Sequence, residues 1–499
     1  MSLRKVSFGA LVSLVGGTYG LLVLGLMRLP LEYDEAFNMT VVKNLGSQFM
    51  YATNGAMSMP PGPKFFDPFI TTGPSLMVPS ALLWFITGGS VVGVRIVPLA
   101  FFIAYLVGLW RIAPGGSSPW TKLMMVSAPL TLVVPTAFEH AAFVPTRLVG
   151  ETAAACLLLW GVRLVVRGRW FVGGLLCGLA VQTKYVASIP LAAALFAVAV
   201  SFVIVGRPIR LKSLMNLASG VILPTLIFES IRLMVLGIKD YVDSLGVIVD
   251  YSASVVQVGD KENADAMTKM TSLGNMFETH SFLVIALVVS LALGLMLMGE
   301  ARREAGIEGE SADDAASNGL LTSAALLIAG AASLVFWLLF VQEPSGRHSL
   351  VGLLLMVPGL CLLAQRAALH TGKLRVGLTL LAFVGCGFIA LNSAAKSWDL
   401  VRVDSLLEEQ RQIADLLEDR GVSALDVDGW WQHPEFQVLT DLPIETPDKQ
   451  SEMLIFDLIQ GSYVFGLSDL SSFEETEKFR DKCKYTVFDS KYYVICRPQ

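Results

Sequence analysis

Long apolar runs recur along most of the chain and alternate with short polar segments. A helix needs about 20 mostly apolar residues to cross the ~30 Å hydrocarbon core of a bilayer, and these runs have that length. The pattern therefore predicts an all-α polytopic membrane protein with about eleven transmembrane helices. We place these helices at residues 8–28, 92–112, 123–137, 150–166, 170–185, 187–206, 214–236, 281–299, 319–341, 349–365 and 376–393.

Basic residues predict the orientation of these helices. Short loops rich in Lys and Arg stay in the cytoplasm, and such loops follow every second predicted helix. We therefore expect a multi-pass protein of the cell (inner) membrane with a cytoplasmic N-terminus and outer segments at 29–91, 138–149, 237–280, 342–348 and beyond about 394. The basic groups are Arg4 with Lys5, Arg111 with Lys122, Arg163 with Arg167 and Arg169, Arg207 with Arg210 and Lys212, Arg302 with Arg303, and Arg366 with Lys373 and Arg375.

The apolar stretch 69–89 is the exception to this alternation. The predicted helices on either side of it, 8–28 and 92–112, already run outward and inward, so a further crossing would break the pattern. Pro74 and Pro79 also interrupt the stretch, and each proline removes a helical hydrogen bond. We expect it to lie in the outer interface or to re-enter the membrane as a broken helix.

The chain changes character toward its C-terminus. Residues 406–421 carry apolar side chains at helical spacing. Beyond them, short segments alternate apolar and polar residues as strands do, with one helix expected at 473–482. We therefore divide the chain into a transmembrane domain, 1–393, and a small α/β extracytoplasmic domain, 394–499.

Two cysteines flank a predicted β-hairpin near the C-terminus. The turn is expected near Asp489 and Ser490, which would bring the sulfurs of Cys483 and Cys496 roughly opposite each other. A disulfide can form there if this end of the chain faces an oxidising compartment. Both the bonded and the free state stay open at this point.

Composition agrees with the membrane assignment and excludes one class of partner. The chain has 54% hydrophobic and only 16% charged residues, whereas a soluble chain has about 25% charged residues. The formal net charge is −5, and nothing is basic enough to bind nucleic acid. The lipid bilayer is an expected partner, and nucleic acid is not.

Two adjacent carboxylates, Asp34 and Glu35, follow directly after the first predicted span. Carboxylates next to a membrane are costly if they lose water without gaining a partner. In one interpretation they are a solvated helix start, with Asp34 as the cap. In the other, Asp34 is a general base, and Glu35 binds a metal or holds the acceptor of the reaction.

The context of these acids favours the second interpretation. A Pro-containing segment, FDPFITTGPSL, opens the interfacial stretch, and Arg95 begins the next span. This order of acids, Pro-containing segment and arginine resembles the superfamily of protein O-mannosyltransferases and aminoarabinose transferases. Its members are GT-C glycosyltransferases that use polyprenyl-phosphate sugars. Family members usually open this helix with His-Pro-Pro-Leu. The His is absent here, and Asp67 stands near its place.

Further segments carry the same resemblance over most of residues 1–365. Arg147 and Glu151 resemble the family's Arg-then-acid element, and their spacing of four places both on one face of a helix. Lys184 ends a Gly-rich span as in the family. Arg347 and His348 stand where Arg-Tyr is usual.

The resemblance implies a membrane glycosyltransferase acting at the outer face of the cytoplasmic membrane. It would move a sugar from a polyprenyl-phosphate donor to an acceptor, which is a protein, a lipid or a polysaccharide. A carboxylate is needed to take the acceptor's proton, and cations are needed to stabilise the departing phosphate. We assign Asp34 as the general base and expect Glu35 to hold the acceptor or a metal ion. The residues expected to bind the substrate are Arg347, His348, Lys184, Arg95, Arg147 and Asp67.

No soluble nucleotide cofactor is required, because the lipid phosphate itself is the leaving group of the activated sugar. A divalent cation is the one cofactor for which the sequence offers ligands, namely Glu139, His140 and Glu151.

Two other functions stay open. A secondary transporter or flippase for lipid-linked or envelope precursors would place ionisable residues near the middle of the membrane on broken helices. Here the ionisable residues cluster at one surface, and even Glu229 and Arg232 map to the outer side. A non-catalytic scaffold with the same GT-C architecture would keep the fold without a catalytic role for the acids.

Overall fold

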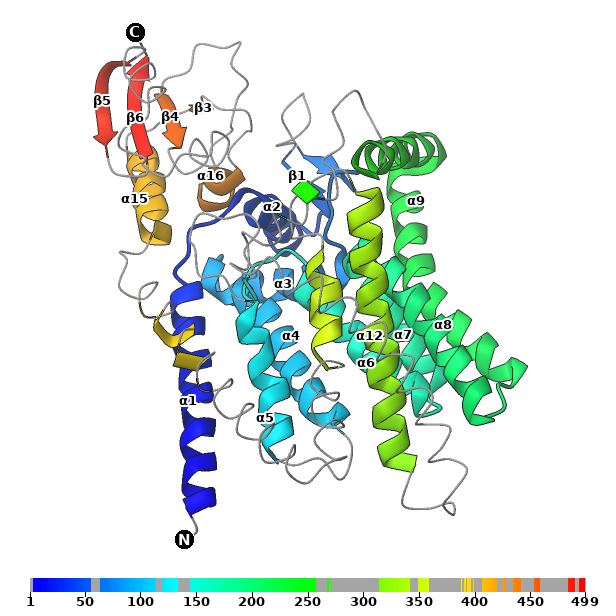
Figure 1. Ribbon diagram of the computed structural model, residues 1–499. Coiled ribbons are helices and arrows are strands. Elements are labelled where there is room, and N and C mark those ends of the chain that lie inside the picture. Colours follow the sequence, from blue (N-terminus) through cyan, green and yellow to red (C-terminus); the bar gives the residue numbers. More distant parts are fainter. Residues whose placement is uncertain are drawn as a thin grey trace.

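The structure is a computed structural model (Figure 1). It describes residues 3–54, 63–113, 119–132, 144–256, 314–341, 349–358, 406–419, 425–427, 434–440, 453–457, 483–489 and 493–498, together with isolated positions between 267 and 398.

The described part of the chain is mostly helical, and its long helices run side by side (Figure 1). Among the described residues, five helices are long and apolar enough to cross a membrane, and they match the spans predicted at 8–28, 92–112, 187–206, 214–236 and 319–341. The span predicted at 281–299 and most of the one at 376–393 lie outside the described residues. The bundle helices are α1 (Leu3–Leu26), α4 (Val91–Ile112), α5 (Pro119–Ser127), α6 (Glu151–Val166), α7 (Trp170–Thr183), α8 (Ser188–Val205), α9 (Leu211–Val256) and α12 (Asp314–Phe340).

Some predicted spans differ from the helices observed. The stretch predicted as 123–137 is α5 followed by a 3₁₀ turn, Ala128–Thr131, because Pro129 cannot continue the helix. The span predicted at 349–365 begins as a helix that is described over residues 350–358. It packs closely on α12, where a Cβ added at Gly330 would lie 2.4 Å from the carbonyl oxygen of Gly352.

Close packing of small residues also joins α7 to α9. A Cβ added at Gly174 would lie 2.4 Å from the carbonyl oxygen of Leu217, and one added at Gly178 would lie 2.3 Å from that of Val221. Lipid chains are as apolar as leucine, so helices in a membrane gain stability by packing their backbones closely at small residues.

This packing makes a stability prediction. We expect Gly174→Val to destabilise the protein by about 1–3 kcal/mol, because overpacking forces the two backbones apart. The measurement is thermal unfolding of the purified full chain in detergent. Gly17→Val is the matched control, since Gly17 is exposed on α1 with nothing near its missing Cβ. Equal unfolding temperatures for the two variants would contradict the close α7–α9 contact.

Two short helices lie at the end of the bundle where α4 and α6 begin. Figure 1 shows α2 (Tyr33–Gln48) nearly end-on above α3 (Pro74–Ile86), so its axis crosses the direction of the long helices. With 13 residues, α3 is about 20 Å long at ~1.5 Å per residue, too short to cross a bilayer. The prediction that 69–89 is not a regular span is therefore consistent with the structure.

A small hairpin that the sequence analysis did not predict lies between α2 and α3. Its strands are β1 (Ala52–Thr53) and β2 (Lys64–Phe65), which pair antiparallel. Two-residue strands are too short to show an alternating pattern in the sequence.

The long helix α9 bends near its middle. Gly237 has φ 74° and ψ 169°, a conformation outside the helical region that glycine adopts without strain. The part before the bend agrees with the predicted span 214–236. Beyond it, exposed apolar residues at positions 238, 242, 245 and 249 form one face of the helix, as expected for a helix that lies on a membrane surface.

The described C-terminal residues contain helices and a four-stranded sheet, and the helix expected at 473–482 lies outside the described residues. The sheet has the order β3-β4-β6-β5, with β3 parallel to β4 and the other neighbours antiparallel. Its elements are α15 (Leu406–Asp419), β3 (Leu425–Val427), α16 (Pro434–Leu439), β4 (Met453–Asp457), β5 (Cys483–Asp489) and β6 (Tyr493–Pro498).

The register of the last two strands corrects one expectation. Cys483 pairs with Pro498, and Cys496 pairs with Thr486, so the two cysteines are not directly opposite each other. The physical reason is that irregularities in the ladder, between Cys483 and Tyr485 and again between Thr486 and Phe488, shift the pairing.

The C-terminal helices are anchored to the segment that carries the adjacent acids. The side-chain amide of Gln410 in α15 donates to the carbonyl oxygen of Leu31 (3.1 Å) and accepts from its N–H (2.8 Å). Lys43 of α2 donates through Nζ to carbonyl oxygens at the end of α16, those of Gln437 (3.0 Å) and Thr440 (2.7 Å) among them. Cations are favourable at helix C-termini, so these contacts hold α16 on α2.

Candidate active site

Segments far apart in the sequence meet at the α2 end of the bundle. Asn38 of α2 donates through Nδ2 to the carbonyl oxygen of Leu148 (2.7 Å) and to Thr72 Oγ1 (3.2 Å). The N–H of Gly73 donates to the carbonyl oxygen of Thr183 at the end of α7 (3.0 Å). These bonds join α2, the segment before α3, the segment before α6 and the end of α7 at one place.

Glu35 and Arg95 form a fully buried ion pair. Arg95 Nε lies 2.8 Å from Glu35 Oε1, and Nη2 lies 2.6 Å from Oε2, which is the bidentate geometry of a strong pair. The remaining guanidinium donors go to the carbonyl oxygens of Met27, Leu29 and Pro30. All five N–H donors of Arg95 are therefore used within the protein.

This result changes the roles expected for the two residues. Arg95 has no N–H left for a phosphate in this structure, and both Glu35 oxygens accept from Arg95. The pair instead fixes the turn between α1 and α2, since Arg95 contacts three carbonyl oxygens of that turn. Their observed role is to position the chain on either side of Asp34.

Asp34 lies in the first turn of α2 and is half-buried. Successive side chains of a helix point about 100° apart, so Glu35 facing Arg95 turns Asp34 toward a different side. An anion is favourable in the first turn of a helix. Asp34 is thus a half-buried acid in the first turn of α2, next to the Glu35–Arg95 pair.

A second ion pair joins Arg147 to Glu32. Arg147 Nη1 lies 3.5 Å from Glu32 Oε2, and both side chains are at least nine-tenths buried. Arg147 Nε is buried and has no hydrogen-bond acceptor among the described residues. The sequence analysis missed Glu32, although it belongs to the acidic run Glu32-Tyr33-Asp34-Glu35.

A third pair joins Lys184 to Glu151. Lys184 Nζ lies 3.2 Å from Glu151 Oε1 and donates to the carbonyl oxygen of Val149 (3.0 Å). α6 begins only at Glu151, after Gly150 with φ 91°. The expectation that Arg147 and Glu151 share one face of a helix is therefore wrong, because Arg147 lies in the turn that precedes the helix. The two residues belong to different ion pairs.

Asp67 organises the loop before α3. Its carboxylate accepts from Thr53 Oγ1 (2.6 Å) and from the N–H of Phe69 (3.0 Å), and Lys64 Nζ lies 3.9 Å away. The side chain is fully buried. These contacts hold the loop before α3 on β1.

A cluster that the sequence analysis did not assign lies near the bend of α9. The buried Arg232 pairs with Glu229 (3.5 Å), and its guanidinium lies 5.6 Å from the ring centre of Tyr241. The rings of Tyr51 and Phe228 are 5.5 Å apart. Burial raises the pKa of Tyr51, so its hydroxyl stays protonated, and that hydroxyl has no hydrogen-bond partner among the described residues.

The remaining predicted site residues are not described. Glu139 and His140 lie in 133–143, and Arg347 and His348 lie in 342–348, both outside the described residues. Within the part of the chain that the structure describes, no three metal-binding side chains come together. The third predicted metal ligand, Glu151, faces Lys184.

The chain shares its fold with solved structures of GT-C architecture. It is similar to two crystal structures of the GT-C aminoarabinose transferase ArnT from Cupriavidus metallidurans. The apo form gives a TM-score of 0.55 at 11% identity, with 98% of this chain and 97% of that chain covered. The form bound to undecaprenyl phosphate gives 0.54 at 10% identity, with 98% of each chain covered.

No protein-family model and no curated protein sequence matches the chain. At 10–11% identity the likeness to ArnT shows the fold. The resemblance to aminoarabinose transferases that the spaced motifs indicated is thereby confirmed at the level of the fold.

Proposed function

We propose that this protein is a membrane glycosyltransferase that moves a sugar from a polyprenyl-phosphate donor to an acceptor at the outer face of the cytoplasmic membrane. The observation that carries the proposal is Asp34, half-buried in the first turn of α2 beside the saturated Glu35–Arg95 pair. The ArnT-like fold supports it, since one of the similar structures is bound to undecaprenyl phosphate.

The proposed reaction needs one base and a site for the leaving group. An oxygen or nitrogen of the acceptor attacks the anomeric carbon, the bond from that carbon to the phosphate oxygen breaks, and polyprenyl phosphate leaves. Asp34 takes the acceptor's proton. The activated sugar brings its own leaving group, so no nucleotide cofactor takes part.

Cations of the second and third ion pairs are the proposed contacts of the phosphate. Arg147 keeps its Nε donor, and Lys184 has three N–H donors, of which the described contacts account for two. Both side chains are largely shielded from water. A positive charge in such an environment stabilises a developing anion more strongly than it would in water. Arg347 and His348 remain proposed substrate contacts.

The proposed lipid path follows from the position of α3. Its apolar residues Val78, Leu82, Phe85 and Ile86 are exposed, so α3 can border an isoprenoid chain in the membrane while the phosphate stays at the interface. The acceptor is a protein, a lipid or a polysaccharide.

We assign Glu151 the role of pairing with Lys184 rather than binding a divalent cation, because the ion pair already balances the charge of the Glu151 carboxylate.

Reconstitution tests this function against its alternatives. Purified protein in proteoliposomes receives polyprenyl-phosphate sugar labelled in the sugar, together with an envelope extract as the acceptor source. We expect labelled acceptor and an equal amount of released polyprenyl phosphate, with Arg210→Gln at the opposite end of the bundle as an active control. Movement of labelled donor across the bilayer without a covalent product would favour a flippase and overturn the proposal.

A further inference from the structure

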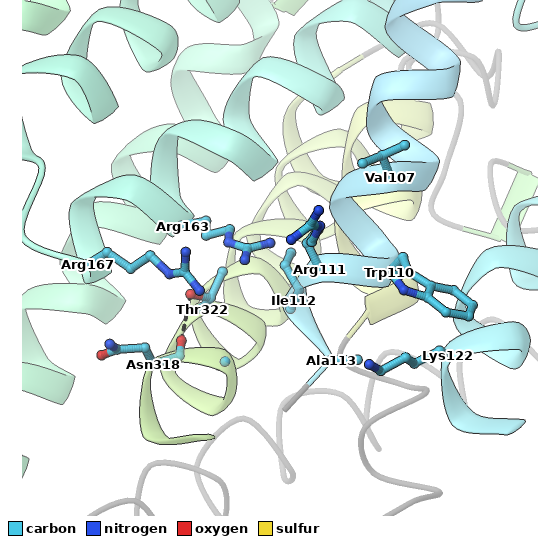
Figure 2. A pocket seen from close by; sticks show the side chains of 11 residues that line it. Val107, Trp110, Arg111, Ile112, Ala113, Lys122, Arg163, Arg167, Asn318 and Thr322 are labelled. Atoms are coloured by element: carbon cyan, nitrogen blue, oxygen red, sulfur yellow. Dashed lines mark hydrogen bonds between the residues drawn. The ribbon is translucent and has the colours of Figure 1, made fainter. Parts of the chain in front are cut away.

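A second charged site lies at the opposite end of the bundle. A cavity of about 500 Å³ opens where α4 and α6 end and where α5 and α12 begin (Figure 2). Arg163 lines it, twelve residues along α6 from Glu151, so the cavity lies about 18 Å from the candidate active site at ~1.5 Å per residue. Such a volume is typical of small-ligand sites.

Four cations line this cavity: Arg111, Lys122, Arg163 and Arg167. Figure 2 shows their side chains around one space, and they come from three elements. None of the described lining residues is acidic. Like charges this close repel one another, so their convergence costs free energy unless an anion joins them.

Arg163 is a buried cation, and one of its nitrogens has no hydrogen-bond acceptor among the described residues. Its side chain is 6% exposed, and its guanidinium lies 5.3 Å from the ring centre of Trp160. Its Nη1 atom is buried and has no acceptor among the described residues. A buried guanidinium without a hydrogen-bond acceptor is costly. The preference of cytoplasmic loops for Lys and Arg explains the presence of basic residues at this end, but not a buried one that faces a cavity.

Polar and apolar neighbours complete the site. Asn318 and Thr322 of α12 add neutral polar groups, and Asn318 Oδ1 accepts from Arg207 Nη1 (2.7 Å). On another side, Val107 and Trp110 line the cavity and are also exposed on the outside of the bundle. The cavity is thus bordered by exposed apolar side chains on the outside of the bundle.

We propose that this cavity binds a phosphate group. Guanidinium groups bind phosphate through paired, charge-assisted hydrogen bonds, and three of the four cations are arginines. The phosphate arrives either on the headgroup of an anionic lipid, past Val107 and Trp110, or as a free anion from water.

The test compares these two sources with the full-length protein. In the lipid arm, delipidated protein is mixed with vesicles of phosphatidylcholine and phosphatidylglycerol, and the lipids that co-purify are quantified by mass spectrometry. In the soluble arm, inorganic phosphate is titrated onto protein in phosphatidylcholine nanodiscs by calorimetry. The variant is Arg111→Gln/Arg167→Gln, whose two positions are exposed, so the fold is kept. The control is Arg210→Gln/Lys212→Gln, which removes equal charge outside the cavity.

We expect the wild type to enrich phosphatidylglycerol or to bind inorganic phosphate saturably, and the successful arm identifies the source. The Arg111/Arg167 variant should bind the phosphate group at least about tenfold more weakly, because the loss of one charge-assisted hydrogen bond already lowers the affinity by about that factor. The control should bind like the wild type. Absence of binding in both arms, or equal losses in variant and control, would overturn the proposal.

Discussion

Asp34→Asn is expected to lower sugar transfer by about 10²–10⁴-fold, the range that a positioned general base contributes. The amide cannot take a proton from the acceptor, yet it has nearly the same shape as the carboxylate. The neighbouring Glu35–Arg95 pair is untouched, so the turn between α1 and α2 should stay in place. The measurement is the initial rate of transfer from labelled polyprenyl-phosphate sugar in proteoliposomes, together with the KM for the donor.

A control separates catalysis from a general effect of charge. Asp240→Asn removes an exposed carboxylate beyond the bend of α9 and should leave the rate unchanged. The KM for the donor should stay close to that of the wild type in Asp34→Asn, because the proposed phosphate contacts are Arg147 and Lys184. Undiminished transfer by Asp34→Asn would remove Asp34 as the base.

Arg95→Met is expected to destabilise the protein by about 3–5 kcal/mol, because it leaves the Glu35 carboxylate buried without its cation. It also removes the donors from three backbone carbonyl oxygens of the turn before α2. Transfer activity should fall with stability, since this turn positions Asp34. Thermal unfolding of the purified protein and the transfer assay measure the two effects.

A double variant makes this prediction specific to the ion pair. Glu35→Leu/Arg95→Met replaces both charges with apolar side chains and should be more stable than Arg95→Met alone. Recovery should be partial, because the carbonyl oxygens of Met27, Leu29 and Pro30 still lack donors. If Arg95→Met unfolds at the wild-type temperature, the pair does not hold this turn.

The sequence was sufficient for features that depend on local pattern. Apolar length predicted the five described helices that are long enough to cross a membrane, and the stretch 69–89 contains only the 13-residue helix α3, which continues through Pro79. The four described C-terminal strands lie in segments where apolar and polar residues alternate. Each of these signals lies within about 20 neighbouring residues, so one sequence carries it completely.

The pairing of charges could not be predicted in this way. The sequence did not indicate that Arg95 pairs with Glu35 and donates to three carbonyl oxygens of the turn before α2. Arg147 and Glu151 looked like helix neighbours, but the positive φ of Gly150 starts the helix after Arg147. Which cation meets which acid depends on how distant helices pack, and the spacing of residues along the chain does not contain that information.

The anchoring of the acid-bearing segment by the C-terminal helices has a consequence for biosynthesis. Leu31 and Lys43 bond to partners 379 and up to 397 residues later in the chain. A nascent chain exposes its first segment long before it exposes these partners, so the segment can reach its final position only after residue 440 has left the ribosome. We therefore expect the protein to mature as one of the last events of its own synthesis, and truncated chains should accumulate in the bilayer without becoming competent for the proposed transfer.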